Sequence, residues 1–116
     1  MAEKPDPDDV FELLGDRYVR TILRAASEDD MSAKELSEAC DSAKSTVYRR
    51  IDDLVALGLL AEKTELEADG SHHSVYEANI DHLDVDIYDG TIDVSVHVRE
   101  DAAQRFSRIW SDIRES

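Results

Sequence analysis

Basic, hydroxyl and aromatic side chains are concentrated in one short stretch of an otherwise acidic chain. The members of this cluster are Lys44, Ser45, Thr46, Tyr48, Arg49 and Arg50. An arginine can hold a guanine through two hydrogen bonds in the DNA major groove or bind a phosphate, and hydroxyl groups also bind phosphates. From Ser42 to Arg50 the chain has three basic residues and no acid. The stretch is therefore a candidate DNA contact, and the alternative is a solvated helix face whose arginines pair with Asp52 and Asp53.

Two histidines, His82 and His97, form the second candidate site. If Asp89-Gly90 makes a two-residue turn, positions 82 and 97 lie directly opposite each other, on the same face as Asp84. Two facing imidazoles near a carboxylate can bind a divalent metal or sense protons. Cross-strand neighbours with unrelated roles are commoner, so the sequence alone does not lead us to assign a metal site.

Catalytic motifs are not found in the sequence. Cys40 is the only cysteine, and we expect it to be a small buried core residue. A thiol redox switch stays open as an alternative, although no electropositive residue adjoins Cys40 to lower its pKa. The chain has no Gly-rich phosphate loop, no H-E-x-x-H pattern and no nucleophile elbow. We therefore expect no enzyme activity, no cofactor and no small-molecule ligand.

Two helices joined by a tight turn are expected around the basic cluster. Ser32 followed by Glu35 is a capping-box pattern that begins the first helix. Asp41 and Ser42 supply turn and N-cap chemistry before the second helix, over 43–57, and Gly58 suits a left-handed C-terminal cap. The apolar residues at helical spacing are Leu36, Cys40, Val47, Ile51 and Leu54. This pattern predicts a helix-turn-helix whose second helix enters the major groove.

The segment resembles the helix-turn-helix of ArsR-type winged-helix regulators, which are small dimeric transcription factors of archaea and bacteria. The residues that carry the resemblance are Glu35-Leu36, Lys44 to Val47, Arg49 to Ile51, and Leu54 to Leu60. The resemblance implies a winged helix, a homodimer and a double-stranded DNA partner. In the turn, Asp41 stands where a glycine is usual and Ser42 where an apolar residue is usual.

Two hairpins are expected after the helix-turn-helix. Strands at Ala61–Glu67 and Val75–Ala78, around the turn Asp69-Gly70-Ser71, predict a wing that lies over the DNA backbone. The expected wing contacts are Lys63 and the tip residues His72 and His73, and the alternative is a solvated turn with incidental histidines. The second hairpin, 81–98, has the Asp89-Gly90 turn between alternating apolar strands.

The register of the second hairpin follows from its turn. Ile87 should face Ile92, Val85 should face Val94, and Leu83 should face Val96. The opposite face should be wet, with Asp84, Asp86, Asp93 and Ser95. This hairpin is an addition to ArsR-type folds, which often pass directly from the wing to a C-terminal helix.

The segments at the two ends have different expected roles. Residues 1–8 are charged and proline-bearing, and we expect them to be loose. A first helix should extend to Ala26 and pack behind the helix-turn-helix, with Gly15 and Asp16 loosening its middle. Over 99–116 the spacing predicts an amphipathic helix that either covers the domain's own core or forms the dimer interface. The expected interface residues are Ala103, Phe106, Ile109, Trp110 and Ile113.

The charge of the chain is unusual for a DNA-binding protein. The 116 residues include 28 acids and 13 basic residues, which gives a formal net charge of −15. One explanation is a protein-binding winged helix that does not contact DNA. The other is a cytosol at molar salt, since few lysines and many aspartates resemble haloarchaeal proteins. We favour the second, because at molar salt the Debye length is about 3 Å and distant acids hardly repel DNA.

These observations predict one compact α+β domain: a loose segment over 1–8, a winged helix-turn-helix over 9–80, an extra hairpin over 81–98 and a C-terminal helix over 99–116. The expected function is a sequence-specific transcriptional regulator of a halophilic archaeon, bound to a palindromic operator as a homodimer. The alternative is a winged-helix interaction module of a transcription complex. Without a signal-peptide or membrane-span pattern, we expect a cytoplasmic protein, with K⁺ or other cations bridging carboxylates and phosphates at the DNA interface.

Overall fold

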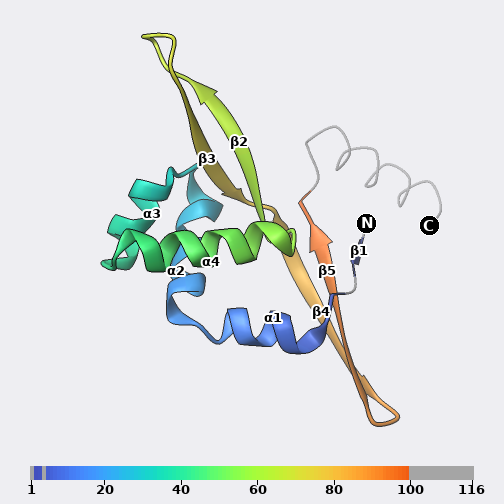
Figure 1. The fold of residues 1–116 in the computed structure, drawn as a ribbon. Coiled ribbons are helices and arrows are strands. Elements are labelled where there is room, and N and C mark those ends of the chain that lie inside the picture. The colour runs from blue at the N-terminus through green and yellow to red at the C-terminus, as the bar shows by residue number, and fades with distance from the viewer. Residues whose placement is uncertain (1, 4, 100–116) are drawn as a thin grey trace, which may run out of the picture.

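The computed structural model describes residues 2–3 and 5–99 (Figure 1). After a two-residue strand, β1 (Ala2–Glu3), the chain forms four helices: α1 (Pro7–Leu14), α2 (Arg17–Glu28), α3 (Ala33–Cys40) and α4 (Lys44–Ala56). Four strands follow: β2 (Leu60–Leu66), β3 (His72–Ala78), β4 (Ile80–Tyr88) and β5 (Thr91–Val98). This is an α+β helix-turn-helix fold with a wing-like hairpin, as predicted. The expected C-terminal helix, with its interface residues Ala103, Phe106, Ile109, Trp110 and Ile113, lies outside the described residues.

The first helical segment is two helices and not one. Gly15 and Asp16 separate α1 from α2, and Asp16 is the N-cap of α2. Its carboxylate accepts hydrogen bonds from the backbone amides of Tyr18, at 2.8 Å, and Val19, at 3.1 Å. The prediction of one helix through this point was wrong, because an aspartate placed before an apolar helical repeat satisfies the free amides of a new helix.

The helix-turn-helix itself forms with one change of detail. The Ser32–Glu35 capping box is present at the start of α3. Asp41 ends α3 in the left-handed conformation, with φ 51°, so this aspartate fills the role usually given to glycine. The N-cap of α4 is Ala43, which offers no side-chain hydrogen bond, and the expectation of N-cap chemistry at Ser42 was wrong.

The end of α4 has the expected glycine cap. Gly58 has φ 78°, and its amide donates to the carbonyl of Val55 at 3.0 Å. The amide of Leu59 donates to the carbonyl of Leu54 at 2.9 Å. This pair of bonds is a Schellman motif, and it turns the chain directly from α4 into β2.

The core lies where α2, α3 and α4 meet the starts of the two hairpins. Its buried members are Val19, Ile22, Ala26, Leu36, Val47, Ile51, Leu54, Leu59, Leu60, Ala78 and Val96. The inward residues of α4 are thus Val47, Ile51 and Leu54, as their spacing predicted. Burying one face of α4 in this way fixes the opposite face as the surface of the domain.

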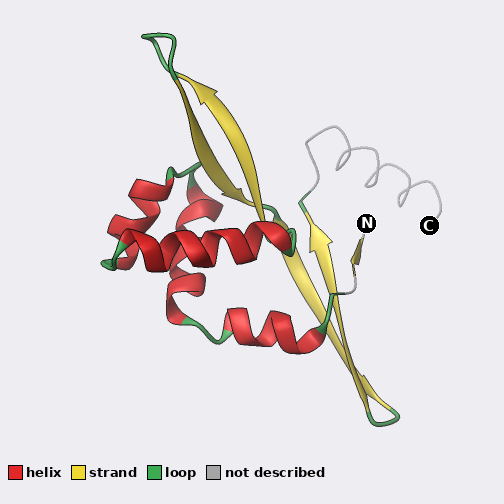
Figure 2. Ribbon diagram, viewed as in Figure 1, coloured by secondary structure: helices red, strands yellow, loops and turns green. Residues whose placement is uncertain are grey.

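The two hairpins extend from the helices in opposite directions (Figure 2). The strands β2 and β3 form the wing, and an isolated bridge between Met31 and Tyr76 ties β3 to the α2–α3 loop. The second sheet has the order β1-β5-β4, in which β1 (Ala2–Glu3) pairs with β5. The structure therefore differs from the loose segment expected over 1–8. Two of these residues form β1, and α1 already begins at Pro7.

The register of β4 and β5 is the one predicted from the turn. Ile87 pairs with Ile92, Val85 with Val94, Leu83 with Val96, and His82 with His97. Asp89 and Gly90 both have positive φ, at 46° and 75°, as a type I′ turn requires. An irregularity between Ile80 and His82 shifts the pairing at the base of the hairpin.

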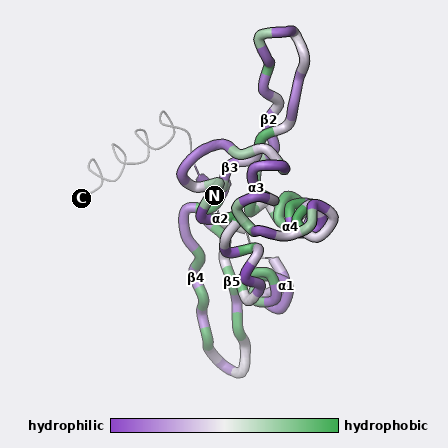
Figure 3. The backbone as a smooth tube through the Cα atoms, turned by 90° about the vertical axis from the view of Figure 1, so that its left-hand side faces the viewer, coloured by the Kyte–Doolittle hydropathy of each residue, from purple (hydrophilic) through white to green (hydrophobic). Residues whose placement is uncertain are grey.

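The burial of this hairpin differs from the expectation. Val94 and Val96 are buried, but Val85 and Ile92 are about half exposed and Ile87 is 75% exposed. Ser95, which was expected on the wet face, is buried. The reason is that the helices cover only the base of the hairpin, while hydrophobic and hydrophilic residues continue to alternate along β4 to its uncovered end (Figure 3).

Candidate nucleic-acid interface

The outer face of α4 carries four exposed residues at helical spacing. Ser45, Tyr48, Arg49 and Asp52 follow an i, i+3, i+4, i+7 pattern and all are exposed. Arg49 forms no ion pair within residues 2–3 and 5–99. The predicted contacts Ser45, Tyr48 and Arg49 thus share one surface, and Asp52 adds an acid to it.

The start of α4 adds a lysine and free backbone amides to this surface. Lys44 is exposed and occupies the first position of the helix, and Thr46 is half-buried beside it. No side chain caps the helix at Ala43, so the first-turn amides are open to an external acceptor. A helix N-terminus with free amides and a lysine favours an anion such as a phosphate group.

Arg50 lies on the inner side of α4 and has a partner within the domain. Its Nε donates to Oδ2 of Asp16 at 2.8 Å, and the two side chains are only 28% and 23% exposed. Burial opposes ionisation of Asp16, but the hydrogen bonds from Arg50, Val19 and Tyr18 and the charge of Arg50 lower its pKa overall. The arginine therefore fastens α4 to the start of α2. The sequence suggested Asp52 or Asp53 as alternative partners and missed Asp16, whose only signal was its N-cap position.

Lys63 also has partners within the domain. Its Nζ lies 2.8 Å from Oδ2 of Asp30 and 3.2 Å from Oε2 of Glu77. These two hydrogen-bonded carboxylates raise the pKa of Lys63. The lysine links the α2–α3 loop to both strands of the wing, so its charge is already balanced in the domain.

The histidines of the wing lie in its strand ladder and not at its tip. His72 faces Leu66 and His73 faces Glu65, and the tip is the turn that follows Glu67. Nδ1 of His73 is 2.7 Å from Oε1 of Glu67. The imidazole of His73 therefore lies beside the carboxylates of Glu65 and Glu67.

A surface hollow between α3, α4 and β3 adds one residue that the sequence reasoning missed. Lys34, Tyr48, Asp52 and Ser74 are among the residues that line it. Lys34 is exposed and forms no ion pair in the described part of the chain. Lys34 lies in α3 and lines the same hollow as Tyr48. After Lys44 and Arg49, it is the third basic residue of this surface that forms no ion pair with a described residue.

Cys40 is partly buried against the core, in agreement with its expected structural role. Its Sγ lies 3.7 Å from the carbonyl oxygen of Tyr18. Burial raises the pKa of the thiol, and the nearby charge of Asp16 adds to the effect. The protonated thiol is the unreactive form, so the surroundings of Cys40 do not favour redox chemistry.

Comparison with known proteins agrees with the geometry of α3 and α4. Residues 14–63 match a family model described as a helix-turn-helix domain. The matched segment includes α2, α3, α4 and the first part of β2. No curated protein matches the chain. The fold and the match together support a helix-turn-helix domain of the kind found in DNA-binding transcription regulators.

Within residues 2–3 and 5–99, no helix is both long enough and apolar enough to cross a bilayer.

Proposed function

We propose that the chain is a sequence-specific DNA-binding transcriptional regulator of the winged-helix type, from a halophilic archaeon, that binds a palindromic operator as a homodimer. The observation that carries the proposal is the outer face of α4. On that face Arg49 is exposed and unpaired among the described residues, beside Ser45 and Tyr48, within a matched helix-turn-helix domain. A helix placed in this way presents its N-terminal half to base edges in the major groove.

The residues of this face have distinct proposed roles. Arg49 reads a guanine or holds a phosphate, and Tyr48 contacts a phosphate or a thymine methyl group. Lys44, Ser45 and Thr46 bind the backbone phosphates together with the free amides of α4. Arg50 positions α4 through Asp16 and does not contact bases directly, which revises the role expected from its sequence position.

The wing has a secondary role in this proposal. Lys63 and His73 are next to carboxylates in the domain, so each must exchange or share a partner before it can bind a phosphate, whereas exposed His72 has no such partner among the described residues. A hollow between α1 and α4 is lined by Arg49 and Arg50 together with Asp9, Glu12 and Asp53. Cations from a concentrated salt solution offset these acids when DNA approaches, because distant charges are screened within about 3 Å at 1 M salt.

The homodimer is proposed from the sequence pattern over 99–116. Phe106, Ile109, Trp110 and Ile113 recur at the spacing of one helix face. A two-fold dimer places two copies of α4 in successive major grooves, about one helical turn of DNA apart. The two-fold symmetry of the dimer gives the operator its palindromic form, and the separation of the two α4 helices sets the half-site spacing.

The test is selective retention of genomic DNA fragments by the purified chain in KCl from about 0.1 to 2 M, with folding followed by circular dichroism. Arg49→Ala should abolish retention of the selected site. Arg24→Ala is the matched control, because Arg24 is an exposed arginine of α2 away from the face of α4. Retention that survives Arg49→Ala would refute the assignment of the reading helix. If the folded chain retains no DNA at any salt, the proposed function is wrong and a protein partner must be sought.

A further inference from the structure

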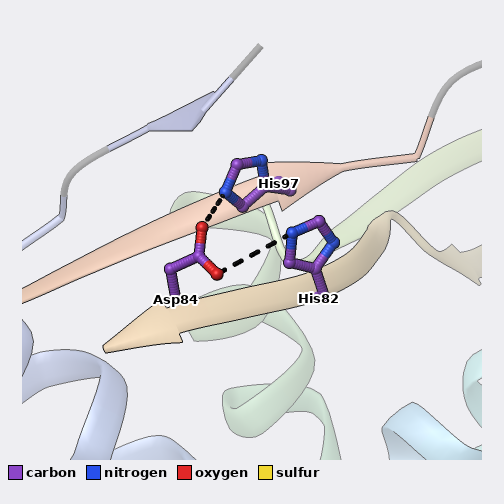
Figure 4. Close-up of side chains that lie close together, drawn as sticks. All are labelled: His82, Asp84 and His97. Atoms are coloured by element: carbon purple, nitrogen blue, oxygen red, sulfur yellow. Dashed lines mark hydrogen bonds and ion pairs between the residues drawn. The ribbon is translucent and has the colours of Figure 1, made fainter. Parts of the chain in front are cut away.

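Three side chains with metal-binding atoms meet at the base of the β4–β5 hairpin (Figure 4). They are His82 and Asp84 on β4 and His97 on β5. Nε2 of His97 lies 2.6 Å from Oδ2 of Asp84, and Nε2 of His82 lies 4.0 Å from Oδ1 of the same carboxylate. One ligand atom from each residue lies within 4.8 Å of the others.

The hairpin itself fixes this arrangement. His82 and His97 are directly paired across the two strands, and Asp84 is two residues from His82 on the same face. The two imidazole rings stack with their centroids 4.0 Å apart and an angle of 12° between their planes. Both Nε2 atoms thereby face one carboxylate, as Figure 4 shows.

The separations suit a shared ion. Zinc binds histidine nitrogen and carboxylate oxygen at about 2.0–2.2 Å, which places tetrahedral ligands about 3.4 Å apart. The present separations of 2.6 and 4.0 Å lie on either side of that value. An ion therefore requires these side chains to rotate until the separations become similar.

The surroundings favour a cation and leave it accessible. Asp86 and Asp93 lie directly opposite each other on the same face, one step further along the ladder. Like charges in this position repel one another, and a nearby cation relieves the repulsion. The side chains of His82, Asp84 and His97 are 56%, 53% and 30% exposed, so an ion can enter from solvent.

We propose that His82, His97 and Asp84 bind one divalent transition-metal ion, with zinc, cobalt, nickel and copper as the fitting class. Two imidazoles and one carboxylate are the donors this class accepts, whereas magnesium and calcium take oxygen ligands. The ion fastens β4 to β5 near the point where β5 ends at Val98. The site is on a different hairpin from the wing, and its existence does not depend on the proposed DNA binding.

The test is a titration of the metal-free full chain with Zn²⁺ and with Co²⁺ against a competing chelator in concentrated KCl. The expected result is one ion per chain. His82→Gln, His97→Gln and Asp84→Asn should each weaken binding by at least about tenfold, since even the outer partners of metal ligands contribute that much. His72→Gln and Asp53→Asn are the matched controls, because each removes the same chemical group at a position outside the β4–β5 hairpin.

A spectroscopic measurement separates a specific site from loose attraction to acids. Zn²⁺ should shift the imidazole ¹⁵N resonances of His82 and His97 and leave those of His72 unchanged. The proposal is overturned if neither metal binds, if the control variants weaken binding as much as the ligand variants, or if the resonances of His82 and His97 do not move. Circular dichroism of each variant shows that the comparison is made on folded chains.

Discussion

The Asp16–Arg50 pair provides the sharpest test of how α4 is held in place. Asp16 both caps α2 and accepts a charged hydrogen bond from Arg50 at 2.8 Å. Loss of an N-cap costs about 1 kcal/mol. A charged hydrogen bond contributes about 1.5–3 kcal/mol, and we reduce this to about 1 kcal/mol because roughly a quarter of each side chain is in water. Asp16→Ala should therefore lower the free energy of unfolding by about 2 kcal/mol.

Two further variants separate the cap from the charge. Asn is as good an N-cap as Asp, so Asp16→Asn should cost only the charge contribution of about 1 kcal/mol. Arg50→Met keeps much of the apolar stem of the arginine and removes its charge. The double variant completes a cycle in which the coupling between the two positions should be about 1 kcal/mol. Asp53→Asn controls for the general relief of repulsion when an acid is removed from a chain of charge −15.

The pH dependence of the pair has a definite sign. The pKa of Asp16 is lowered in the folded state, so its stabilisation is present above the pKa of the unfolded chain and is lost as pH falls through the folded value. Because an unfolded aspartate titrates at about pH 3.9, the difference between wild type and Asp16→Asn should shrink below about pH 4. Denaturant unfolding at the lowest KCl that keeps the chain folded measures all of these quantities. A coupling below about 0.3 kcal/mol, or equal costs for Asp16→Ala and Asp16→Asn, would refute this account.

Three other measurements test separate parts of the structure. Gly90→Ala should destabilise the domain by about 1 kcal/mol in denaturant unfolding, because φ is 75° at this position and an L-residue is strained there. A Cβ added at Gly90 would meet no atom within 4 Å apart from its chain neighbours, so the cost comes from the backbone alone. Val96→Ala should lower the free energy of unfolding by about 2 kcal/mol, because Val96 is buried, and Ile87→Ala by less than about 0.5 kcal/mol, because Ile87 is exposed. Equal costs for the two variants would contradict the observed burial of the hairpin. In a DNA-binding titration with KCl, affinity should stay flat or rise up to the molar range, and a steep loss while the protein remains folded would contradict the proposed role of bridging cations.

Features set by local chemistry were predictable from the sequence. The Asp89-Gly90 turn fixes the twist of its hairpin, so the pairing of His82 with His97 followed by counting. The capping box at Ser32 and the glycine cap at Gly58 also act within one helical turn of their partners. Each of these predictions needed only residues that are close in sequence or joined by a turn of known geometry.

Features that depend on distant partners were not predictable in this way. Arg50 and Asp16 are 34 residues apart, and no spacing rule connects them. The alternation along β4 identified the apolar face correctly, but whether the helices reach far enough to cover Ile87 depends on how the whole domain packs. The N-cap of α4 is Ala43, one residue later than the expected Ser42, because Asp41 and Ser42 are both taken up by the turn that follows α3.

The distribution of partners among the basic residues bears on how such an acidic domain can recognise DNA. Arg50 and Lys63 are engaged by carboxylates, whereas Lys34, Lys44 and Arg49 form no ion pair with any described residue. On the surface formed by α3 and α4 these are three free cations per copy, or six in the proposed dimer, which is the low end of the 6–10 contacts that give other regulators about 10³–10⁵-fold salt sensitivity. At molar salt, phosphate attraction contributes little binding free energy, because the gain from releasing counterions falls as salt rises. Under the proposed function, discrimination between sites therefore depends mainly on base contacts of α4 and on the shape of the DNA, both of which persist at salt concentrations that screen charge.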